Sequence, residues 1–380
     1  MSNPCLDEFF TTFTNLPDMM EYHAAQARES QWRRVPVNAL RVLPLPETPP
    51  LFIDKTAFDP SVSEEAIADT AAHVGLAIRA GEEPCFPLRD TAWKSLLERA
   101  KINGTALPKL SREELTNVLN ACLALFESEA LLLIRSEKVA AVHSGDARDY
   151  AILPMDALFG HLESGLQARF PGAEFETGYS DHTMTSTSFL LPDQKDDLLQ
   201  TYAKTLEANG QKALADALMP GIRFTTSDVG FSSAKLTALL HGLSLPFSIG
   251  SVVAVEHRWE KKPEEFGEAI GKVFAQFGDV IAKLEALLHI GLDYPVNAMT
   301  AVCKKLSLPK KAAVEAISMF EMTCGSTATA HDVFMALQEI LFVLKTEHTP
   351  QAKLLAVEES LARALTLRWT DFDLAKAVSY

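Results

Sequence analysis

The sequence holds two short patterns that partly match catalytic motifs, and neither is complete. The segment FGEAIGKVF has the glycines and the lysine, Lys272, of a phosphate-binding loop, but it is one residue short. Val273 also stands where Ser or Thr would bind magnesium. Ser232 and Lys235 have the spacing of a serine nucleophile and its lysine, but no Lys-Thr-Gly or Ser-Asp-Asn accompanies them. We therefore assign no catalytic residue. Whether the chain is an enzyme stays open, with a non-catalytic role favoured.

Histidines and cysteines, the common ligands of transition metals, show no metal-binding spacing. The ten histidines form no His-x-x-x-His or His-Glu-x-x-His pattern. The pairs Asp181-His182 and His331-Asp332 place neighbouring side chains on different faces of a strand or helix. The cysteines are scattered, without a Cys-x-x-Cys pair: Cys5, Cys85, Cys122, Cys303 and Cys324. We expect reduced, buried thiols and no metal or other cofactor.

Positive charge gathers in three short segments, although the chain as a whole is acidic. They comprise Trp32, Arg33, Arg34 and Arg41, then His257, Arg258, Trp259, Lys261 and Lys262, and finally Lys304, Lys305, Lys310 and Lys311. The first two combine arginine with tryptophan, which together hold single strands by phosphate contact and base stacking. The alternative for both tryptophans is a core residue flanked by solvated charges.

Further candidates for nucleic-acid binding lie on or beside expected strands: Arg135, Arg148, Tyr150 and Arg223. Arg135, within LLLIRS, could equally be a buried, paired arginine.

The composition is that of a folded globular protein. The 380 residues are 47% hydrophobic and 22% charged, and 35 Lys+Arg against 50 Asp+Glu give a formal charge of −15. No apolar run reaches the roughly 18 to 20 residues of a membrane-spanning helix, and the N-terminus does not resemble a signal peptide. We expect a soluble, cytoplasmic protein with no membrane partner.

The periodicity changes from mixed to helical along the chain. The first sixty residues predict a helix over the apolar positions from Phe9 to Met20, a short strand and a proline-stiffened arm. Helices are then expected over residues 61–81 and 86–102, the second after an Asp90 cap, and from Ser111, whose spacing to Glu114 fits a capping box.

The middle third favours strands in hairpins. Residues 130–144 predict a hairpin that turns at Ser136 and Glu137, and 221–242 predict two strands around Asp228-Val229-Gly230. Further strands are expected over 182–192 and 250–259, with helices over 155–170 and 196–218. Beyond Trp259 the spacing predicts helices, at 266–288, 294–306, 310–323, 329–346 and 351–367.

These patterns predict an α+β fold with a central hairpin-rich antiparallel or mixed sheet, flanked by helices, and a C-terminal all-helical region. Three segments are expected as domains: an N-terminal helix, strand and Pro-rich arm over 1–58, an α+β core over 59–255, and a helical region over 256–380.

Five segments follow one another in an order shared with a known family. They are FPLRDTAWKSLLERAKI, LTNVLNACLAL, LLLIRSEKVAAVHSGDARDYAILPMDAL, GIRFTTSDVGFSSAKL and GSTATAHDVFMALQEIL. In this order the chain resembles the phage and plasmid-like family catalogued as domain of unknown function 932. The positions that match its short motifs are Asn120, Arg135, Ser144, Asp146, Tyr150, Ser227, Asp228 and Gly230, with Asp228 in place of the usual Glu. The resemblance implies a gene of a phage, prophage or conjugative plasmid, and no agreed biochemical activity.

The leading hypothesis is a non-catalytic protein of a mobile element that binds or anneals single-stranded DNA in recombination or plasmid establishment. Such annealing proteins commonly assemble as rings or filaments, so a homo-oligomer is part of this hypothesis. The first alternative is an anti-defence or host-interaction protein that engages a host partner through its acidic surface. The second is an unrecognised enzyme.

Overall fold

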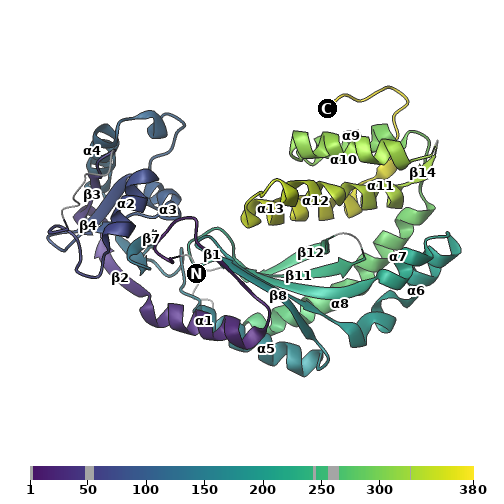
Figure 1. Cartoon of the computed structure of the whole chain (residues 1–380), viewed down its shortest axis with the longest axis horizontal. Coiled ribbons are helices and arrows are strands. Elements are labelled where there is room, and N and C mark those ends of the chain that lie inside the picture. The colour runs from purple at the N-terminus through teal and green to yellow at the C-terminus, as the bar shows by residue number, and fades with distance from the viewer. Residues whose placement is uncertain (1–2, 48–54, 243–244, 256–264, 326) are drawn as a thin grey trace.

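The computed structural model of the chain describes residues 3–47, 55–242, 245–255, 265–325 and 327–380. It confirms the expected α+β class, with a large antiparallel sheet flanked by helices and a helical C-terminal region (Figure 1). Within these described residues, none of the helices is long and apolar enough to cross a membrane.

The large sheet has the strand order β1-β8-β9-β10-β11-β12, and every neighbouring pair is antiparallel. Its strands are β1 (Phe10–Phe13), β8 (Glu174–Asp181), β9 (Thr185–Leu190), β10 (Met219–Thr226), β11 (Ala234–His241) and β12 (Phe247–Val255). Alternate residues such as Ile222 and Phe224 belong to a buried apolar face. The helices below the sheet in Figure 1 pack on this face: α1 (Leu16–Glu29), α5 (Met155–Arg169), α6 (Lys195–Ala208) and α8 (Glu265–Ala286). The short helix α7 (Lys212–Ala217) packs against α6.

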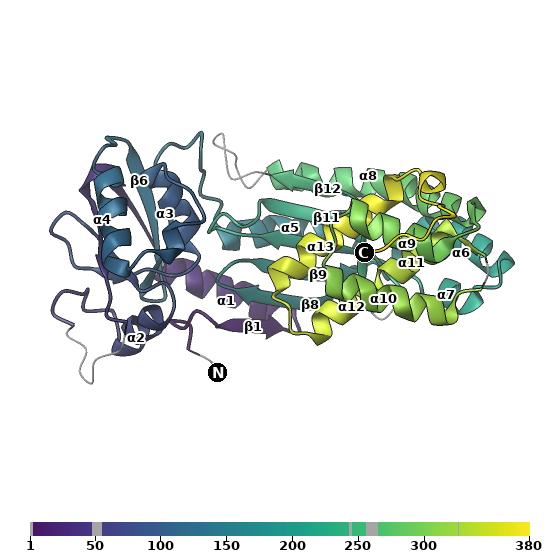
Figure 2. The ribbon, with the colours of Figure 1, turned by 90° about the horizontal axis from the view of Figure 1, so that it is seen from above.

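A smaller unit lies beside one end of the large sheet (Figure 2). It contains two three-stranded sheets, with orders β2-β6-β7 and β3-β4-β5. The strands are β2 (Gln31–Pro36), β3 (Leu40–Pro44), β4 (Leu76–Ala80), β5 (Phe86–Pro87), β6 (Glu129–Arg135) and β7 (Lys138–Ser144). The helices are α2 (Glu64–Ala72), α3 (Ala92–Ala100) and α4 (Arg112–Leu123).

The C-terminal helices lie over the other face of the large sheet, above it in Figure 1. They are α9 (Pro295–Lys305), α10 (Lys310–Thr323), α11 (Ala330–Leu337), α12 (Glu339–Thr346) and α13 (Gln351–Ala362), with the short pair β13 (Gly291–Leu292) and β14 (Ala328–Thr329). Single 3₁₀ turns cover Val37–Ala39, Leu107–Lys109, Pro192–Gln194, Leu287–His289, Arg363–Thr366 and Trp369–Asp371.

Hydrophobic contacts divide the chain near residue 150. One buried cluster runs from Cys5 to Val142 and fills the smaller unit, while a second joins Met19 to residues from Leu153 to Trp369. This division differs from the three segments expected from the sequence, whose boundaries as domains stay a prediction. A third, small cluster combines Leu133 with Val229 of the turn between β10 and β11 and therefore lies where the two units meet.

Several expected elements are confirmed. The hairpin β6-β7 turns at Ser136 and Glu137, with φ of +47° and +68°. Ser111 and Glu114 form the expected capping box at the start of α4. The long helix appears as α8, and β10 and β11 flank the Asp228-Val229-Gly230 turn.

Other expectations are wrong in detail. Phe10–Phe13 is an edge strand, and the first helix begins only at Leu16, after its Asn15 cap. The helix expected over 61–81 ends at Ala72, because Gly75 adopts φ +68° and the buried LAI run that follows pairs with β3 as β4. Thr91, and not Asp90, is the residue before α3.

Two more expected helices are divided: 196–218 into α6 and α7, and 329–346 into α11 and α12. The sequence patterns also missed β8, which pairs with β1 and β9.

Candidate nucleic-acid interface

The sheet β2-β6-β7 turns one face toward the large sheet. Its register places Trp32 opposite Leu133 and Leu133 opposite Ala141. Because strand side chains alternate, these three residues share one face, and Val229 from the β10-β11 turn packs on it. The turn requires Gly230, whose φ is +85°. A connection of the large sheet thus meets the face of the small one that carries Trp32.

Three rings lie against one another at this junction. His143 and Tyr150 are stacked, with ring centroids 3.6 Å apart and planes 6° apart. The Trp32 ring lies 6.2 Å from His143 and 6.0 Å from Tyr150. The Tyr150 hydroxyl donates to the Asp228 carbonyl at 2.8 Å, and His143 Nε2 is 2.8 Å from the same oxygen. Burial, and then the neighbouring Asp228, raise the pKa of Tyr150, so its hydroxyl keeps the proton that it donates.

A buried ion pair, between Arg135 and Asp228, also lies at this junction. Both terminal nitrogens of Arg135 donate to the carboxylate of Asp228, Nη1 at 3.1 Å. Arg135 Nε also donates to Ser30 Oγ at 2.9 Å. Both side chains are about 90% buried, so this fork-shaped contact acts in a low-dielectric setting. Arg135 is therefore a buried, paired arginine, which was the alternative considered from the sequence.

Next to the stacked rings lies a polar cavity of about 270 Å³. It is lined by Lys94, Glu98 and Arg99 of α3, by His143, Ser144, Asp149 and Tyr150, and by Ser227, Gly230, Ser232 and Ser233 of the β10-β11 turn. Helix α3 is held against β7 because Ser95 Oγ accepts from the Val142 amide at 2.9 Å. The cavity thus opens between elements of both units.

Lys94 and Arg99 are the cations of this cavity. Neither forms an ion pair with any residue that the structure describes, and Arg99 Nε is buried without a hydrogen-bond partner among those residues. Glu98 and Asp149 also line the cavity, and Asp149 accepts from Ser144 Oγ at 3.0 Å. Two cations and serine hydroxyls can together receive a phosphate. Of the three stacked rings, His143 and Tyr150 line the cavity.

The remaining described candidates from the sequence lie outside this cavity, and each contacts a carboxylate. Arg33 is 3.5 Å from Glu83 and lies over the Phe86 ring, and Arg34 is 3.5 Å from Glu129. Arg34 also donates to the Gly145 carbonyl.

Arg148 pairs with Asp146 at 2.6 Å on the surface, and Arg223 forms a buried pair with Glu358 of α13. Of the sequence candidates, the junction therefore brings together Trp32, Arg135 and Tyr150.

The second cluster expected from the sequence falls outside the described residues: His257, Arg258, Trp259, Lys261 and Lys262. In the lysine cluster, Lys304 and Lys305 are exposed at the end of α9, and Lys311 pairs with Glu347.

The partial Ser-x-x-Lys pattern is not assembled into a catalytic pair among the described residues. Lys235 Nζ pairs with Glu359 at 2.7 Å, and Ser232 Oγ donates to the Ser233 carbonyl, so Ser232 does not bond to Lys235. His182 Nε2 is 2.8 Å from the Leu6 carbonyl, and burial lowers the pKa of this ring to about 2.

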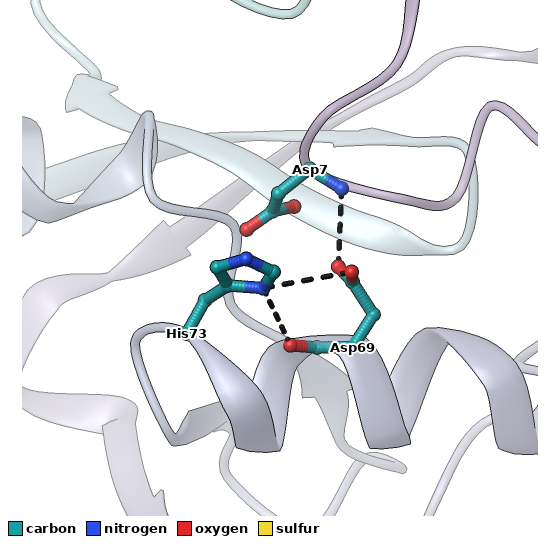
Figure 3. A group of neighbouring side chains, drawn as sticks. All are labelled: Asp7, Asp69 and His73. Atoms are coloured by element: carbon teal, nitrogen blue, oxygen red, sulfur yellow. Dashed lines mark hydrogen bonds and ion pairs between the residues drawn. The ribbon is translucent and has the colours of Figure 1, made fainter.

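One group of described residues has the spacing of metal ligands. Atoms of Asp7, Asp69 and His73 lie within 4.8 Å of one another (Figure 3). Lys138 Nζ, however, bonds to both carboxylates, to Asp7 at 2.9 Å, and Arg89 Nη1 is 3.2 Å from Asp7. Two buried cations already balance the two carboxylates, so the group fits a structural ion-pair network better than a metal site.

Comparisons with models of protein families, with curated proteins and with solved structures find no match.

Sequence reasoning missed Lys94 and Arg99. They lie five residues apart in an amphipathic helix, and although Trp93 is next to Lys94, the segment holds no cluster of adjacent basic residues like those beside Trp32 and Trp259. The usable signal was indirect. Four positions that match the family motifs, Ser144, Tyr150, Ser227 and Gly230, all line the cavity.

Proposed function

We propose that the protein binds single-stranded nucleic acid at the junction cavity and acts without catalysis in recombination or plasmid establishment of a mobile element. The observation that carries this proposal is the cavity itself. It offers two cations without ion pairs to described residues, beside the stack of Trp32, His143 and Tyr150. Phosphates would contact Lys94 and Arg99, and a base would stack against the rings of His143 and Tyr150 that line the cavity.

The mobile-element context rests on the resemblance to the phage and plasmid-like family. The fold supports this resemblance, because positions that match the family motifs are far apart in the sequence but lie together at this junction. Arg135 bonds to Asp228 across 93 residues, and Tyr150 bonds to Asp228 across 78. This role belongs in the cytoplasm, and assembly into a homo-oligomer would suit annealing.

The test is direct binding of a fluorescently labelled single-stranded oligonucleotide, followed by anisotropy, with duplex DNA and single-stranded RNA as comparators. We expect micromolar or tighter binding that weakens as salt is raised, because phosphate contacts release counterions. The comparators decide between DNA and RNA and between single strands and duplex.

Absence of binding at low salt would overturn the proposal. The second candidate, a host-interaction protein, would then take its place. It is favoured by the formal charge of −15 and by the pairing of Arg33, Arg34 and Arg148 with carboxylates, which leaves little free positive charge at those positions.

A further inference from the structure

The upper face of the large sheet is polar although helices cover it. Along β10 and β11, the residues that alternate with the apolar face include Arg223, Thr225, Lys235 and Thr237, with the buried Leu239 beyond them on β11. Hydroxyls continue the pattern onto the neighbouring strands, at Thr177, Ser186, Ser188 and Ser248. A sheet face that is permanently packed under helices is normally apolar, as the lower face is here. The upper face instead has the character of a surface that meets solvent or a polar ligand.

Helix α13 contacts this face through two adjacent glutamates. Glu358 pairs with Arg223, and Glu359 pairs with Lys235 at 2.7 Å. The two cations are close neighbours, because Arg223 lies opposite Thr237 and Lys235 lies opposite Thr225 in the antiparallel register. A short row of negative charge on α13 therefore matches a short row of positive charge on the sheet.

The contact between α13 and the sheet is incompletely filled. Cavities of about 100 Å³ and 140 Å³ lie on either side of the Arg223–Glu358 pair, and both residues line both cavities. Glu358 is 5% exposed, yet its Oε1 has no hydrogen-bond partner among the described residues. Burying a carboxylate oxygen without a hydrogen-bond partner costs free energy. The contact with Arg223 therefore satisfies Glu358 only in part.

We propose that Arg223, Lys235 and the surrounding hydroxyls form a second phosphate-binding site for the single strand, which Glu358 and Glu359 occupy when nucleic acid is absent. Carboxylates and phosphates are both anions whose oxygens accept hydrogen bonds from the same cationic side chains. The acidic pair of α13 thus competes with the strand for the same two side chains. The inference rests on the proposed function and names a further part of its binding surface.

The test compares oligonucleotide binding by the whole chain and by matched charge variants. Glu359→Gln removes one competing charge at a position whose side chain is 39% exposed, so the fold should tolerate it. Glu347→Gln is the control, because it also removes one negative charge and one ion pair, with Lys311, on a different helix pair. Both variants change the net charge equally, so a difference in their affinity is due to the position of the removed charge.

We expect Glu359→Gln to tighten binding about tenfold relative to Glu347→Gln, within the usual range for coupling between sites. Adding Lys235→Gln to Glu359→Gln should remove that gain, because the cation that the change releases is then missing. Thermal melting checks that each variant is folded.

Equal affinities of the Glu359→Gln and Glu347→Gln variants would overturn the inference. If the wild-type protein still bound, and still lost affinity on Lys94→Ala plus Arg99→Ala, the proposed function would stand. If neither the wild-type protein nor any variant bound at low salt, the proposed function itself would fail, and the inference with it.

Discussion

At the scale of single residues, Lys138 holds the N-terminal segment to the smaller unit. Its side chain is fully buried, and its ammonium bonds to Asp7 and Asp69. Replacing it with Met would leave Asp7 paired with Arg89 and Asp69 beside the partly exposed His73. Breaking a buried pair in this way typically costs about 3 to 5 kcal/mol. We therefore expect Lys138→Met to lower the free energy of unfolding by about that amount, measured by urea denaturation.

The matched control for this change is Lys212→Met. Lys212 also contacts two carboxylates, Glu207 and Asp216, but its side chain is 71% exposed. Exposed pairs of this kind contribute about 1 kcal/mol or less. Equal urea midpoints for the two variants would contradict the structural role given to Lys138.

His23 makes the stability of the large unit sensitive to acid. It is fully buried in α1, its ring is stacked on Phe159 at 4.9 Å, and neither nitrogen has a hydrogen-bond partner among the described residues. Burial, followed by the charge of Arg135, lowers its pKa from 6.5 to about 4. Between these values the unfolded chain binds a proton that the folded chain does not, so stability falls as pH falls from about 6.5 toward 4.

We expect His23→Leu to remove part of this loss, at most about 3 kcal/mol, because the apolar side chain carries no titrating group. Thermal melting between pH 4.5 and 7.5 measures it, with the exposed His289→Gln as control. A wild-type pH profile that His23→Leu leaves unchanged would show that other groups cause the loss; burial also lowers the pKa of His241 and His331 to about 4.

Local sequence patterns could identify contacts within a turn but not contacts across the fold. The capping box of Ser111 and Glu114 needed only a spacing of three residues. The partner of Arg135 lies 93 residues away, and that of Arg223 lies 135 residues away. The arginine and tryptophan pattern therefore identified candidate side chains, while the carboxylates that neutralise them could be found only in the folded chain.

At the scale of elements, the β6-β7 hairpin carries backbone strain at its turn. Ser136 and Glu137 both have positive φ, as a two-residue turn with right-handed strand twist requires, but neither is Gly or Asn. Glu137 also accepts from the Ser63 amide at 2.7 Å and so must stay. We expect Ser136→Asn to raise the free energy of unfolding by about 0.5 to 1 kcal/mol, because Asn tolerates this conformation better.

Ser136→Val serves as the opposite control for the turn. A β-branched residue is strained at positive φ and should lower the melting temperature. If Asn and Val gave the same melting temperature, the strain at this position would be negligible and the account of the turn would be wrong.

Periodicity predicted the elements whose environment is uniform along their length. The strands of the β6-β7 hairpin are buried on both faces, and the described side chains of α8 are buried along one continuous face, so their patterns were clear. Residues 76–80 were misassigned because a short buried strand and a buried helix segment have the same apolar composition. The strand β8 was missed because its Glu, Gly and Asp residues are poor strand signals, and its place depends on β1 and β9.

At the scale of the whole molecule, two hydrophobic cores meet at one polar junction. The three-ring stack, the Arg135–Asp228 pair and the cavity all lie where the β10-β11 turn reaches the small sheet. No sequence pattern indicated this meeting, because it depends on the relative placement of two separately packed units. The motif positions of the family resemblance came closest, since several of them line the junction.

The most direct measurement of the central claim is the salt dependence of single-strand binding by the Lys94→Ala plus Arg99→Ala variant. Each phosphate contact to a single strand contributes a slope of about −0.7 to log affinity against log salt. We predict that the double change makes the slope shallower by about 1.4 and weakens binding at low salt. The control, Lys304→Ala plus Lys305→Ala, removes the same charge from exposed positions at the end of α9. Equal slopes for the wild-type protein and the Lys94/Arg99 variant would contradict the assignment of the junction cavity as the nucleic-acid site.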